Sequence, residues 1–483
     1  MRDIKKLVLV FSLLIYVVLL LLYCNKQGFW HDEIYTSTFL KGSSAYDFKG
    51  GSLYDLKDVF SIENCKKILN TDNYSNNFYL QIQHEGHPPL YFFLLKGWSL
   101  IFGYSELALR SFSVVCGILF LLVLNSLIKF KSKKSYIANL FVIITLFNPF
   151  LFYYFSEARM YALAMLFAIL SFNFWVKYQN SVRKVTKDYL MFVLSATALL
   201  YTHYYGVFFL TTLLFFEIIK NGLTNRILKS LLPLLLFSPW LFIIRKQLVF
   251  HSNHWTDGSY SIFDSISGFI NGISELLFSP VSSLLIIEQV ITLIFLIFLL
   301  VLLSKEKKGR YWILGVGIYF LQIFIFDQLL DHHTIIIPRY YIFILIFIIW
   351  GVFNVYEKIP KIVRVFSFSL YIIIGANSIH QIYQLERAPK QMYREISSYI
   401  DVNYNEENTL IVFENKGPSI FGVANYIKGN FNVVYAADYL SNNKYKNIIF
   451  IEEVLGISYL NSIVNVNRDG LKLVPFVGVN LYE

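Results

Sequence analysis

The chain has 483 residues, of which 56% are hydrophobic, 18% are aromatic and only 15% are charged, and its mean hydropathy is +0.52. This is too little polar surface to cover a water-soluble globule of this size, which excludes an ordinary cytosolic enzyme. A net charge of +10 would favour nucleic acid as the partner of a soluble chain. Here Lys and Arg stand in short clusters between apolar segments, where they set membrane topology, so we expect membrane lipids as partners and no nucleic acid.

Apolar runs of about 20 residues recur through the first 385 residues and predict a polytopic α-helical membrane protein with about eleven spans. The basic start Met1 to Lys6 precedes an apolar run from Leu7 to Tyr23, and no small-residue cleavage site follows. We therefore expect an uncleaved first span and not a signal peptide. The later predicted spans cover residues 106–128, 136–154, 160–178, 189–203, 205–220, 229–244, 284–304, 311–330, 340–356 and 365–383.

The stretch from Pro88 to Phe102 is apolar but short, with Lys96 in its middle, and the charge pattern decides how to interpret it. If it lies at the membrane interface, every basic cluster between later spans falls on the side of the N-terminus, as the positive-inside rule requires. The clusters are Lys129 to Lys134, Lys177 to Lys187, Lys220 to Lys229, Lys305 to Arg310 and Lys358 to Arg364. The predicted N-terminus is then cytoplasmic, with residues 24–105, residues 245–283 and the C-terminus outside.

The last 95 or so residues are richer in Asn and charged residues and predict a small extracytoplasmic α/β domain. Its expected helices are Gln391 to Asp401 and Ser419 to Lys428, and its expected strands are Thr409 to Phe413, Val433 to Ala436, Asn447 to Ile451 and Leu471 to Val477. The predicted division is a transmembrane domain over residues 1–385, including the external loop 24–105 with its interfacial helix, and an α/β domain over residues 386–483.

Three cysteines, Cys24, Cys65 and Cys116, have no metal-binding spacing and an odd number, so they support neither a disulfide framework nor a zinc site. A single disulfide between Cys24 and Cys65, outside the membrane, is an alternative.

Ionisable residues at the outer face of the predicted bundle are the best functional evidence, because such groups are costly to bury. Asp32 and Glu33 follow the first span among aromatic residues, although a solvated start of the loop would look the same. His84, Glu85 and His87 directly precede the proline pair that starts the interfacial helix. Free backbone N–H groups and positive charge at a helix N-terminus suit an anionic phosphate.

Further candidates lie at later outer boundaries between spans. Glu157 and Arg159 stand two residues apart, where they could also form a structural pair closing a tight turn. His203 stands in an aromatic stretch and could be an interface anchor only. The remaining groups are His251 with His254, and Asp331, His332 and His333 followed by Arg339. The basic inner loops hold no His, so we expect these outer groups to converge on one cavity.

Several of these motifs, in this order and spacing over about residues 29–206, resemble the dolichyl-phosphate-mannose protein mannosyltransferase-like branch of the GT-C glycosyltransferases. They are Asp32-Glu33, His87-Pro88-Pro89-Leu90-Tyr91, Gly103 with Ala108-Leu109-Arg110, Pro149, Ser156-Glu157-Ala158-Arg159-Met160-Tyr161 and Thr202-His203-Tyr204. Arg339-Tyr340-Tyr341 is a fainter match. The external C-terminal domain resembles, in position alone, the one carried by the lipid A aminoarabinose transferases.

The resemblance implies roles for individual residues. Asp32 is implied as the catalytic base, with Glu33 orienting it or contacting the acceptor. His87, Arg159 and Arg339 are implied as partners of the donor phosphate. Glu157 is implied to hold Arg159 in place. The other implied substrate-binding residues are Glu85, Tyr91, Tyr161 and His203.

A divalent metal is a further hypothesis, since related enzymes place an acidic residue near Glu85 that can take part in metal binding. Two imidazoles and a carboxylate suit zinc, so Glu85 with His251 or His254 is a candidate set, but the metal ligands stay unassigned. No cofactor is otherwise expected, and no Gly-rich nucleotide-binding loop is expected if the donor is lipid-linked.

The implied function is that of an inverting glycosyltransferase that moves a hexose or pentose from a polyprenyl-phosphate donor to a protein, lipid or glycan acceptor on the outer face of the membrane. Two alternatives remain at this point. A transporter or flippase of polyprenyl-linked sugars would also use an outer aromatic cavity, and an O-antigen polymerase or ligase is also a membrane glycosyltransferase. Abundant Asn, Ile and Lys suggest a low-GC bacterium, so the expected location is the bacterial plasma membrane.

Overall fold

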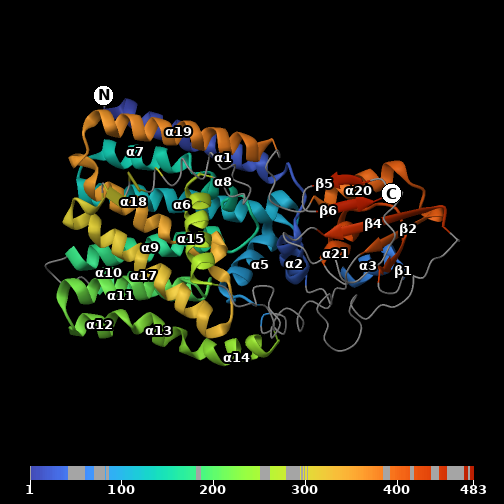
Figure 1. Ribbon diagram of the computed structural model, residues 1–483, viewed down its shortest axis with the longest axis horizontal. Helices are drawn as coiled ribbons and strands as arrows, with labels where there is room; N and C mark the ends of the chain where they lie inside the picture. The colour runs from blue at the N-terminus through green and yellow to red at the C-terminus, as the bar shows by residue number, and fades with distance from the viewer. Residues whose placement is uncertain are drawn as a thin grey trace. The chain divides into compact units, whose positions relative to one another are not determined.

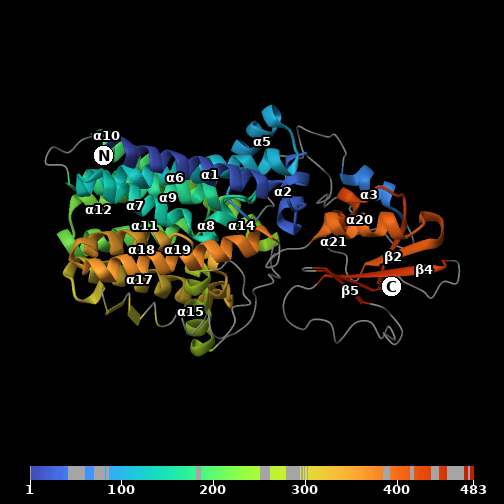
Figure 2. The ribbon, with the colours of Figure 1, turned by 90° about the horizontal axis from the view of Figure 1, so that it is seen from above.

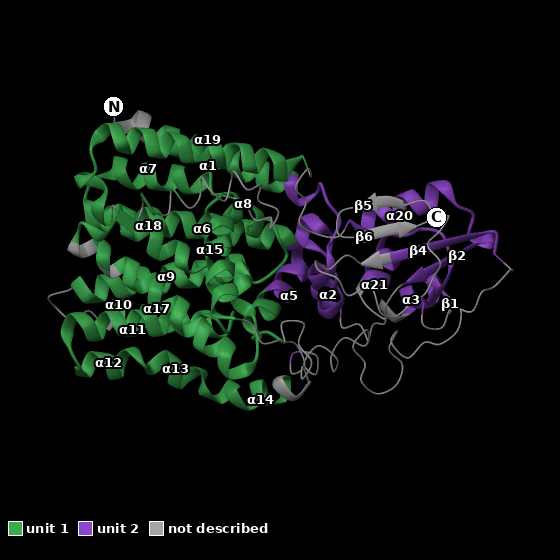
Figure 3. Ribbon diagram, in the orientation of Figure 1, with its two compact units in different colours: residues 1–22, 84–94, 110–387 green, residues 23–83, 95–109, 388–483 purple. Residues whose placement is uncertain are grey.

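The computed structural model describes two compact units (Figure 3). Unit 1 comprises residues 1–22, 84–94 and 110–387, and unit 2 comprises residues 23–83, 95–109 and 388–483. The described residues are 2–41, 60–69, 82, 86–180, 186–250, 261–278, 294, 297–298, 300–301, 303–384, 392–413, 418–436, 445–453, 473–476 and 479–482. Each unit is taken by itself below.

Unit 1 is a bundle of helices, most of which run side by side (Figures 1 and 2). The first of its helices are α1 (Arg2–Cys24), α5 (Leu90–Phe102), α6 (Glu106–Ser132), α7 (Ser135–Leu146), α8 (Pro149–Tyr154), α9 (Tyr161–Asn180), α10 (Thr186–Leu200), α11 (Gly206–Asn221), α12 (Asn225–Ser230), α13 (Leu232–Phe237), η3 (Ser238–Trp240) and α14 (Leu241–Phe250). The rest are α15 (Ile262–Phe278), α17 (Lys307–Leu330), η4 (Thr334–Ile336), η5 (Pro338–Tyr341), α18 (Ile344–Val355), η6 (Tyr356–Lys358) and α19 (Lys361–Tyr383). The last residues of α1, most of α5 and the first residues of α6 belong to unit 2.

Six helical stretches in the described part of the chain are long and apolar enough to cross a membrane. They are Lys6–Cys24, Glu106–Ser132, Tyr161–Asn180, Asn225–Gln247, Trp312–Leu330 and Lys361–Tyr383. Each overlaps one of the predicted spans, so the prediction of a polytopic helical membrane protein is confirmed. The count of about eleven stays a prediction, since α10, α11 and α18 are shorter than a full span and most of residues 284–304 lie outside the described residues.

The predicted span over residues 136–154 is formed by two helices, α7 and α8. The side-chain oxygen of Asn148 accepts a hydrogen bond from the backbone N–H of Leu151 at 2.7 Å, and Pro149 occupies the first helical position of α8. A capping side chain followed by proline is a helix start, so the chain begins a new helix here. The amide of Asn148 also donates to the carbonyl oxygen of Leu276, which ties α8 to α15.

Helix α15 runs across the other helices of unit 1 in both views (Figures 1 and 2). It lies in the part of the chain that the sequence predicts as an external loop. Its packing against η5 is close, because a Cβ at Gly272 would overlap the hydroxyl group of Tyr341, and the rings of Phe269 and Tyr341 are 5.2 Å apart. Glycine at position 272 is therefore required for this contact.

Unit 2 contains a six-stranded mixed sheet in the order β1-β3-β2-β4-β6-β5, with helices α3, α20 and α21 on one side of it (Figure 2). β2 is parallel to β3 and to β4, while the pairings of β1, β5 and β6 are antiparallel. The elements of unit 2 are α2 (His31–Leu40), β1 (Phe60–Ser61), α3 (Ile62–Leu69), α20 (Tyr393–Asn403), η7 (Glu406–Asn408), β2 (Thr409–Phe413), α21 (Pro418–Tyr426), β3 (Asn432–Tyr435), β4 (Asn447–Glu453), β5 (Leu473–Phe476) and β6 (Val479–Tyr482). β2 carries five buried residues in succession, as expected for a strand inside a sheet.

The early segment of the chain contributes to this sheet. Phe60 pairs with Val433, and the backbone N–H of Ile62 donates to the carbonyl oxygen of Phe431 at 2.9 Å. The ammonium group of Lys66, on α3, donates to the carbonyl oxygen of Ile427 at 2.5 Å. Unit 2 thus joins residues of the loop after the first span to the C-terminal segment. The predicted boundary at residue 385 and the extracytoplasmic placement of the domain stay predictions.

The three cysteines are free and buried. This agrees with the absence of a disulfide framework expected from their number and spacing.

Candidate active site

In unit 1, His203 occupies the centre of an aromatic environment between α10 and α11. Its side chain is only 2% exposed. Its ring lies 5.7 Å from that of Tyr161, at the start of α9, and 5.9 Å from that of Phe343. The backbone N–H of Leu90 donates to the carbonyl oxygen of Tyr201 at 2.9 Å, so the start of α5, just after His87, is attached to the same loop.

Positive charges surround the His203 imidazole. Burial is the main cause that holds its pKa well below the usual value of 6.5. The further causes are the positive charges of His87, Arg159 and Arg339, which repel a proton on the ring. Three residues that are widely separated in the chain are therefore brought near one another around a neutral imidazole.

The hydrogen bonds of His203 define which nitrogen can contact a ligand. Nδ1 accepts a hydrogen bond from the backbone N–H of Tyr205 at 3.2 Å, so the proton of the neutral ring resides on Nε2. Nε2 is buried and has no hydrogen-bond partner among the described residues. A buried donor of this kind is costly unless something accepts from it, so Nε2–H suits a ligand oxygen.

Glu157 and Arg159 stand in the turn between α8 and α9, and hydrogen bonds to the backbone of this turn hold it in place. Glu157 is 3% exposed and Arg159 is 5% exposed. The hydroxyl group of Ser113, on α6, donates to the carbonyl oxygen of Glu157 at 2.6 Å, and the backbone N–H of Arg159 donates to the same atom at 2.8 Å. The turn is therefore fixed through its backbone, and an ionic hold of Glu157 on the Arg159 side chain stays a prediction.

Arg339 is half-buried on η5, and its neighbours attach this segment to the His203 loop. The rings of Tyr340 and Tyr205 stack at 4.7 Å with an interplanar angle of 13°. The hydroxyl group of Tyr319, on α17, lies 3.2 Å from the carbonyl oxygens of both Tyr205 and Tyr340. The Arg339 guanidinium lies 5.8 Å from the centre of the Tyr340 ring. These contacts give Arg339 a defined position next to His203.

A buried carboxylate braces the chain just before η5. Asp327, at the end of α17, accepts hydrogen bonds from the hydroxyl group of Thr334 at 2.6 Å and from the backbone N–H of Ile335 at 2.8 Å. Sequence reasoning singled out Asp331 in this region and missed Asp327, because an acid near the end of an apolar helix gives no motif.

The two tyrosines predicted to bind substrate take part in ring packing. Tyr91 is fully buried, with its ring 6.1 Å from that of Phe112 and 5.4 Å from that of Phe92. Tyr161 is 1% exposed and lies 4.9 Å from the ring of Tyr154. Both support the wall of the site, and their contact with substrate stays a prediction.

Glu275, near the end of α15, is a second acid of this region that sequence reasoning missed. It lies close enough to Tyr154 and Tyr341 to perturb both electrostatically. Burial raises its own pKa to about 8. The sequence gives little indication of its role, because Glu275 is a single carboxylate in a predicted loop, directly before the apolar residues Leu276–Phe278.

Asp32 and Glu33 belong to unit 2, where they stand in the first turn of α2. The backbone N–H of Trp30 donates to the Glu33 carboxylate at 3.3 Å, and Glu33 is fully buried. Glu33 therefore caps the N-terminus of its own helix. Asp32 is half-buried.

The residues proposed for a metal lie outside the described residues. These are Glu85, His251 and His254. Within the described part of the chain, no group of three or more His, Cys, Asp or Glu side chains is placed to hold a metal ion. The metal hypothesis therefore stays a prediction.

An apolar cavity of about 100 Å³ lies in unit 1, between α7, α8, α18 and α19. Rings and branched aliphatic side chains form most of its wall, with a few polar groups among them. Its wall includes Phe141, Leu151, Ile348, Phe368, Asn148 and Arg364. A cavity of this composition suits a hydrocarbon chain.

Comparisons with known proteins bear on this arrangement. Residues 86–245, which include His87, Arg159 and His203, match the family model described as dolichyl-phosphate-mannose-protein mannosyltransferase. The structure of ArnT from Cupriavidus metallidurans bound to undecaprenyl phosphate is similar at a TM-score of 0.53 and 11% identity, with 98% of this chain and 97% of that chain covered. The apo structure of the same protein gives a TM-score of 0.52 at 12% identity, with 86% and 84% covered. The chain shares the fold of this protein over nearly its whole length. A search of curated protein sequences finds no significant match.

The shared fold confirms the predicted fold class of a polytopic membrane protein, and the family match over residues 86–245 agrees with the resemblance on which the residue roles rest. At identities of 11% and 12%, the likeness extends to the fold alone. The roles of the individual residues stay predictions.

Proposed function

We propose that the protein is an inverting glycosyltransferase that transfers a sugar from a polyprenyl-phosphate donor to an acceptor hydroxyl group at the outer face of a bacterial membrane. The observation that carries the proposal is the buried His203, whose Nε2 has no hydrogen-bond partner among the described residues and which lies within electrostatic range of His87, Arg159 and Arg339. Positive charge and N–H donors in a water-poor site suit the phosphate that leaves with the lipid.

The proposed reaction is a single displacement. The oxygen of the acceptor hydroxyl group attacks C1 of the sugar and forms the new glycosidic bond, while the bond from C1 to the phosphate oxygen breaks. The electron pair of that bond leaves with the polyprenyl phosphate, whose negative charge the cationic cluster stabilises. The Asp32 carboxylate takes the proton of the acceptor hydroxyl group. One displacement without a covalent sugar on the protein inverts the configuration at C1.

The similarity to ArnT, which was solved with undecaprenyl phosphate, supports a polyprenyl-phosphate donor. The family match to protein mannosyltransferases supports transfer of a hexose. The Lys and Arg clusters lie on the side of the N-terminus, which the positive-inside rule makes cytoplasmic. The candidate residues lie at the opposite ends of the predicted spans, and this supports a reaction at the outer face.

The test uses membranes that contain the full-length protein, supplied with polyprenyl phosphate carrying a radiolabelled sugar. Asp32→Asn keeps the size of the side chain and removes the base. We expect a loss of sugar incorporation of about 10²- to 10⁴-fold, the usual contribution of a general base, with donor binding unchanged. Incorporation by Asp32→Asn at the wild-type rate would refute the role of Asp32.

The phosphate side of the site is tested by donor binding. Arg159→Ala should weaken donor binding about ten- to a hundredfold, the contribution of one charged hydrogen bond. Arg310→Ala, an exposed arginine at the start of α17, is the matched control and should bind donor as the wild type does. A wild-type protein that moves labelled lipid between leaflets without transferring sugar would show that it is a flippase.

A further inference from the structure

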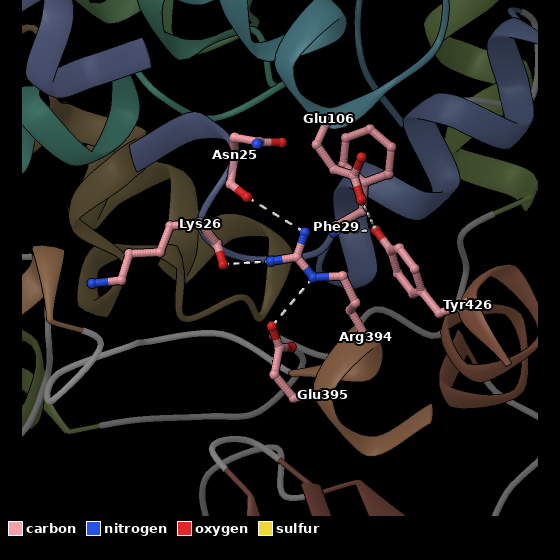
Figure 4. A network of polar contacts seen from close by, with 7 residues as sticks. All are labelled: Asn25, Lys26, Phe29, Glu106, Arg394, Glu395 and Tyr426. Carbon is pink, nitrogen blue, oxygen red and sulfur yellow. Dashed lines mark hydrogen bonds and ion pairs between the residues drawn. The ribbon is translucent and has the colours of Figure 1, made fainter. Parts of the chain in front are cut away.

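The segment between the first span and α2 is held by the C-terminal part of unit 2 (Figure 4). Tyr426 ends α21, and its hydroxyl group accepts a hydrogen bond from the backbone N–H of Phe29 at 2.5 Å. The same hydroxyl group donates to the Glu106 carboxylate at 2.8 Å. One side chain of the C-terminal segment thus connects the entry to α2 with the start of α6.

Arg394, on α20, also holds this segment. Its guanidinium donates to the carbonyl oxygen of Lys26, and more weakly to that of Asn25 at 3.4 Å. A Cβ at Gly28 would lie 2.7 Å from Cβ of Arg394 and 3.1 Å from the Tyr426 ring. The backbone approaches both side chains so closely that only glycine fits without displacement.

Helix α2 is also held along its face and at its C-terminal end. The ring of Tyr35 lies 5.9 Å from that of Phe421, on α21. The ammonium group of Lys96, on α5, donates to the carbonyl oxygen of Leu40 and to the hydroxyl group of Tyr104. A positive charge at the C-terminus of a helix is favourable, which explains a lysine inside the apolar helix α5.

We propose that the C-terminal α/β part of the chain serves catalysis by positioning α2, with Tyr426 and Arg394 as positioning residues for Asp32. This inference rests on the proposed function, in which Asp32 is the base. Phe29 directly precedes the first turn of α2, so a shift of its backbone moves the Asp32 carboxylate with the helix. A misplacement of a reacting group by 1 Å can lower a rate about a hundredfold.

The main variant is Tyr426→Phe, which keeps the ring that packs on Gly28 and removes the hydroxyl group alone. We expect kcat to fall about ten- to a hundredfold and KM for the donor to stay unchanged, because the proposed phosphate partners belong to unit 1. Tyr445→Phe removes a hydroxyl group from the hydrophobic cluster of the same domain and is the matched control, with kcat as in the wild type. Rates are divided by the amount of protein that binds donor, so that a poorly folding variant is still measured.

Gly28→Ala tests the same contact from the chain segment itself. The added methyl group must push Arg394 or Tyr426 away, so we expect the same fall in kcat without a change in KM for the donor. A second line of evidence is the double variant Asp32→Asn with Tyr426→Phe. If Tyr426 acts through Asp32, the double variant should be no slower than Asp32→Asn alone.

The outcomes separate the two proposals. A wild-type kcat for Tyr426→Phe, in a protein that loses activity on Asp32→Asn, overturns the positioning role and leaves the proposed function in place. A further rate loss in the double variant, equal to the loss in the single one, also overturns it, because it shows a general structural effect. Full activity of Asp32→Asn overturns the positioning role and the role of Asp32 as the base, while the observed incorporation still supports sugar transfer.

Discussion

The buried state of His203 predicts a pH dependence of stability that one substitution should remove. The imidazole is neutral in the folded protein, since its pKa lies well below 6.5, and it binds a proton with a pKa of about 6.5 once the chain unfolds. Below pH 6.5 the unfolded state therefore binds more protons at this residue than the folded state does. The free energy of unfolding should fall as the pH decreases from about 6.5 towards the folded-state pKa.

The magnitude follows from linkage for one group. Between pH 7 and pH 5, a single imidazole with these properties lowers the free energy of unfolding by about 2 kcal/mol. The slope is at most about 1.4 kcal/mol for each pH unit, and it approaches zero only above about pH 8, where His203 is neutral in both states. His203→Gln keeps a side-chain acceptor for the backbone N–H of Tyr205 and cannot titrate.

The measurement is thermal unfolding of the purified protein in detergent at pH 5 and at pH 7. We expect the wild type to lose more stability than His203→Gln on acidification, with a difference of about 2 kcal/mol between the two proteins. His380→Gln removes an exposed imidazole from α19 and controls for the loss of a histidine as such. Equal acid sensitivity of the wild type and His203→Gln would refute the buried, neutral state of His203.

Two other predictions concern packing and orientation. In Gly117→Ala the added Cβ would lie 2.5 Å from the Phe155 ring, so we expect the free energy of unfolding to fall by about 1–3 kcal/mol. In Gly97→Ala the added Cβ would have no neighbour within 4 Å. This control should keep the midpoint of thermal unfolding in detergent or raise it slightly. Equal midpoints for the two variants would contradict the contact of α6 with Phe155. Because the native cysteines are buried, an impermeant maleimide added to intact cells should label Glu407→Cys, in the C-terminal domain. It should label Ser135→Cys, at the start of α7, only after permeabilisation. The reverse pattern would refute the predicted topology.

The long apolar helices could be predicted from sequence because hydrophobicity over 20 residues is a strong local signal. The break at Asn148 was readable in principle, since an N-cap residue followed by proline marks a helix start, but the apolar run across it conceals the signal. The pairing of Phe60 with Val433 was not readable. A two-residue strand has no periodicity of its own, and its partner is several hundred residues away in the chain.

For the candidate site, too, residues with a local sequence signal were predictable and residues defined by distant contacts were not. His87, Arg159 and His203 were found because they stand in motifs with fixed spacing. Asp327 and Glu275 were missed, because each is a single acid whose surroundings come from other helices. Tyr426 and Arg394 were missed for the same reason, since a tyrosine and an arginine on short helices acquire significance only through the backbone groups that they contact.

Several positively charged side chains near the buried His203 do not stabilise the fold through that residue. The positive groups of His87, Arg159 and Arg339 oppose a fourth positive charge on the buried ring, which therefore stays neutral. Buried ionisable groups whose pKa values are perturbed are characteristic of functional sites. A phosphate group near the cluster would satisfy the buried Nε2–H of His203 and draw on the positive potential of its neighbours. Negative charge develops on the phosphate as it leaves C1, so the positive groups would bind the transition state more strongly than the bound donor. Such differential binding is what accelerates a reaction.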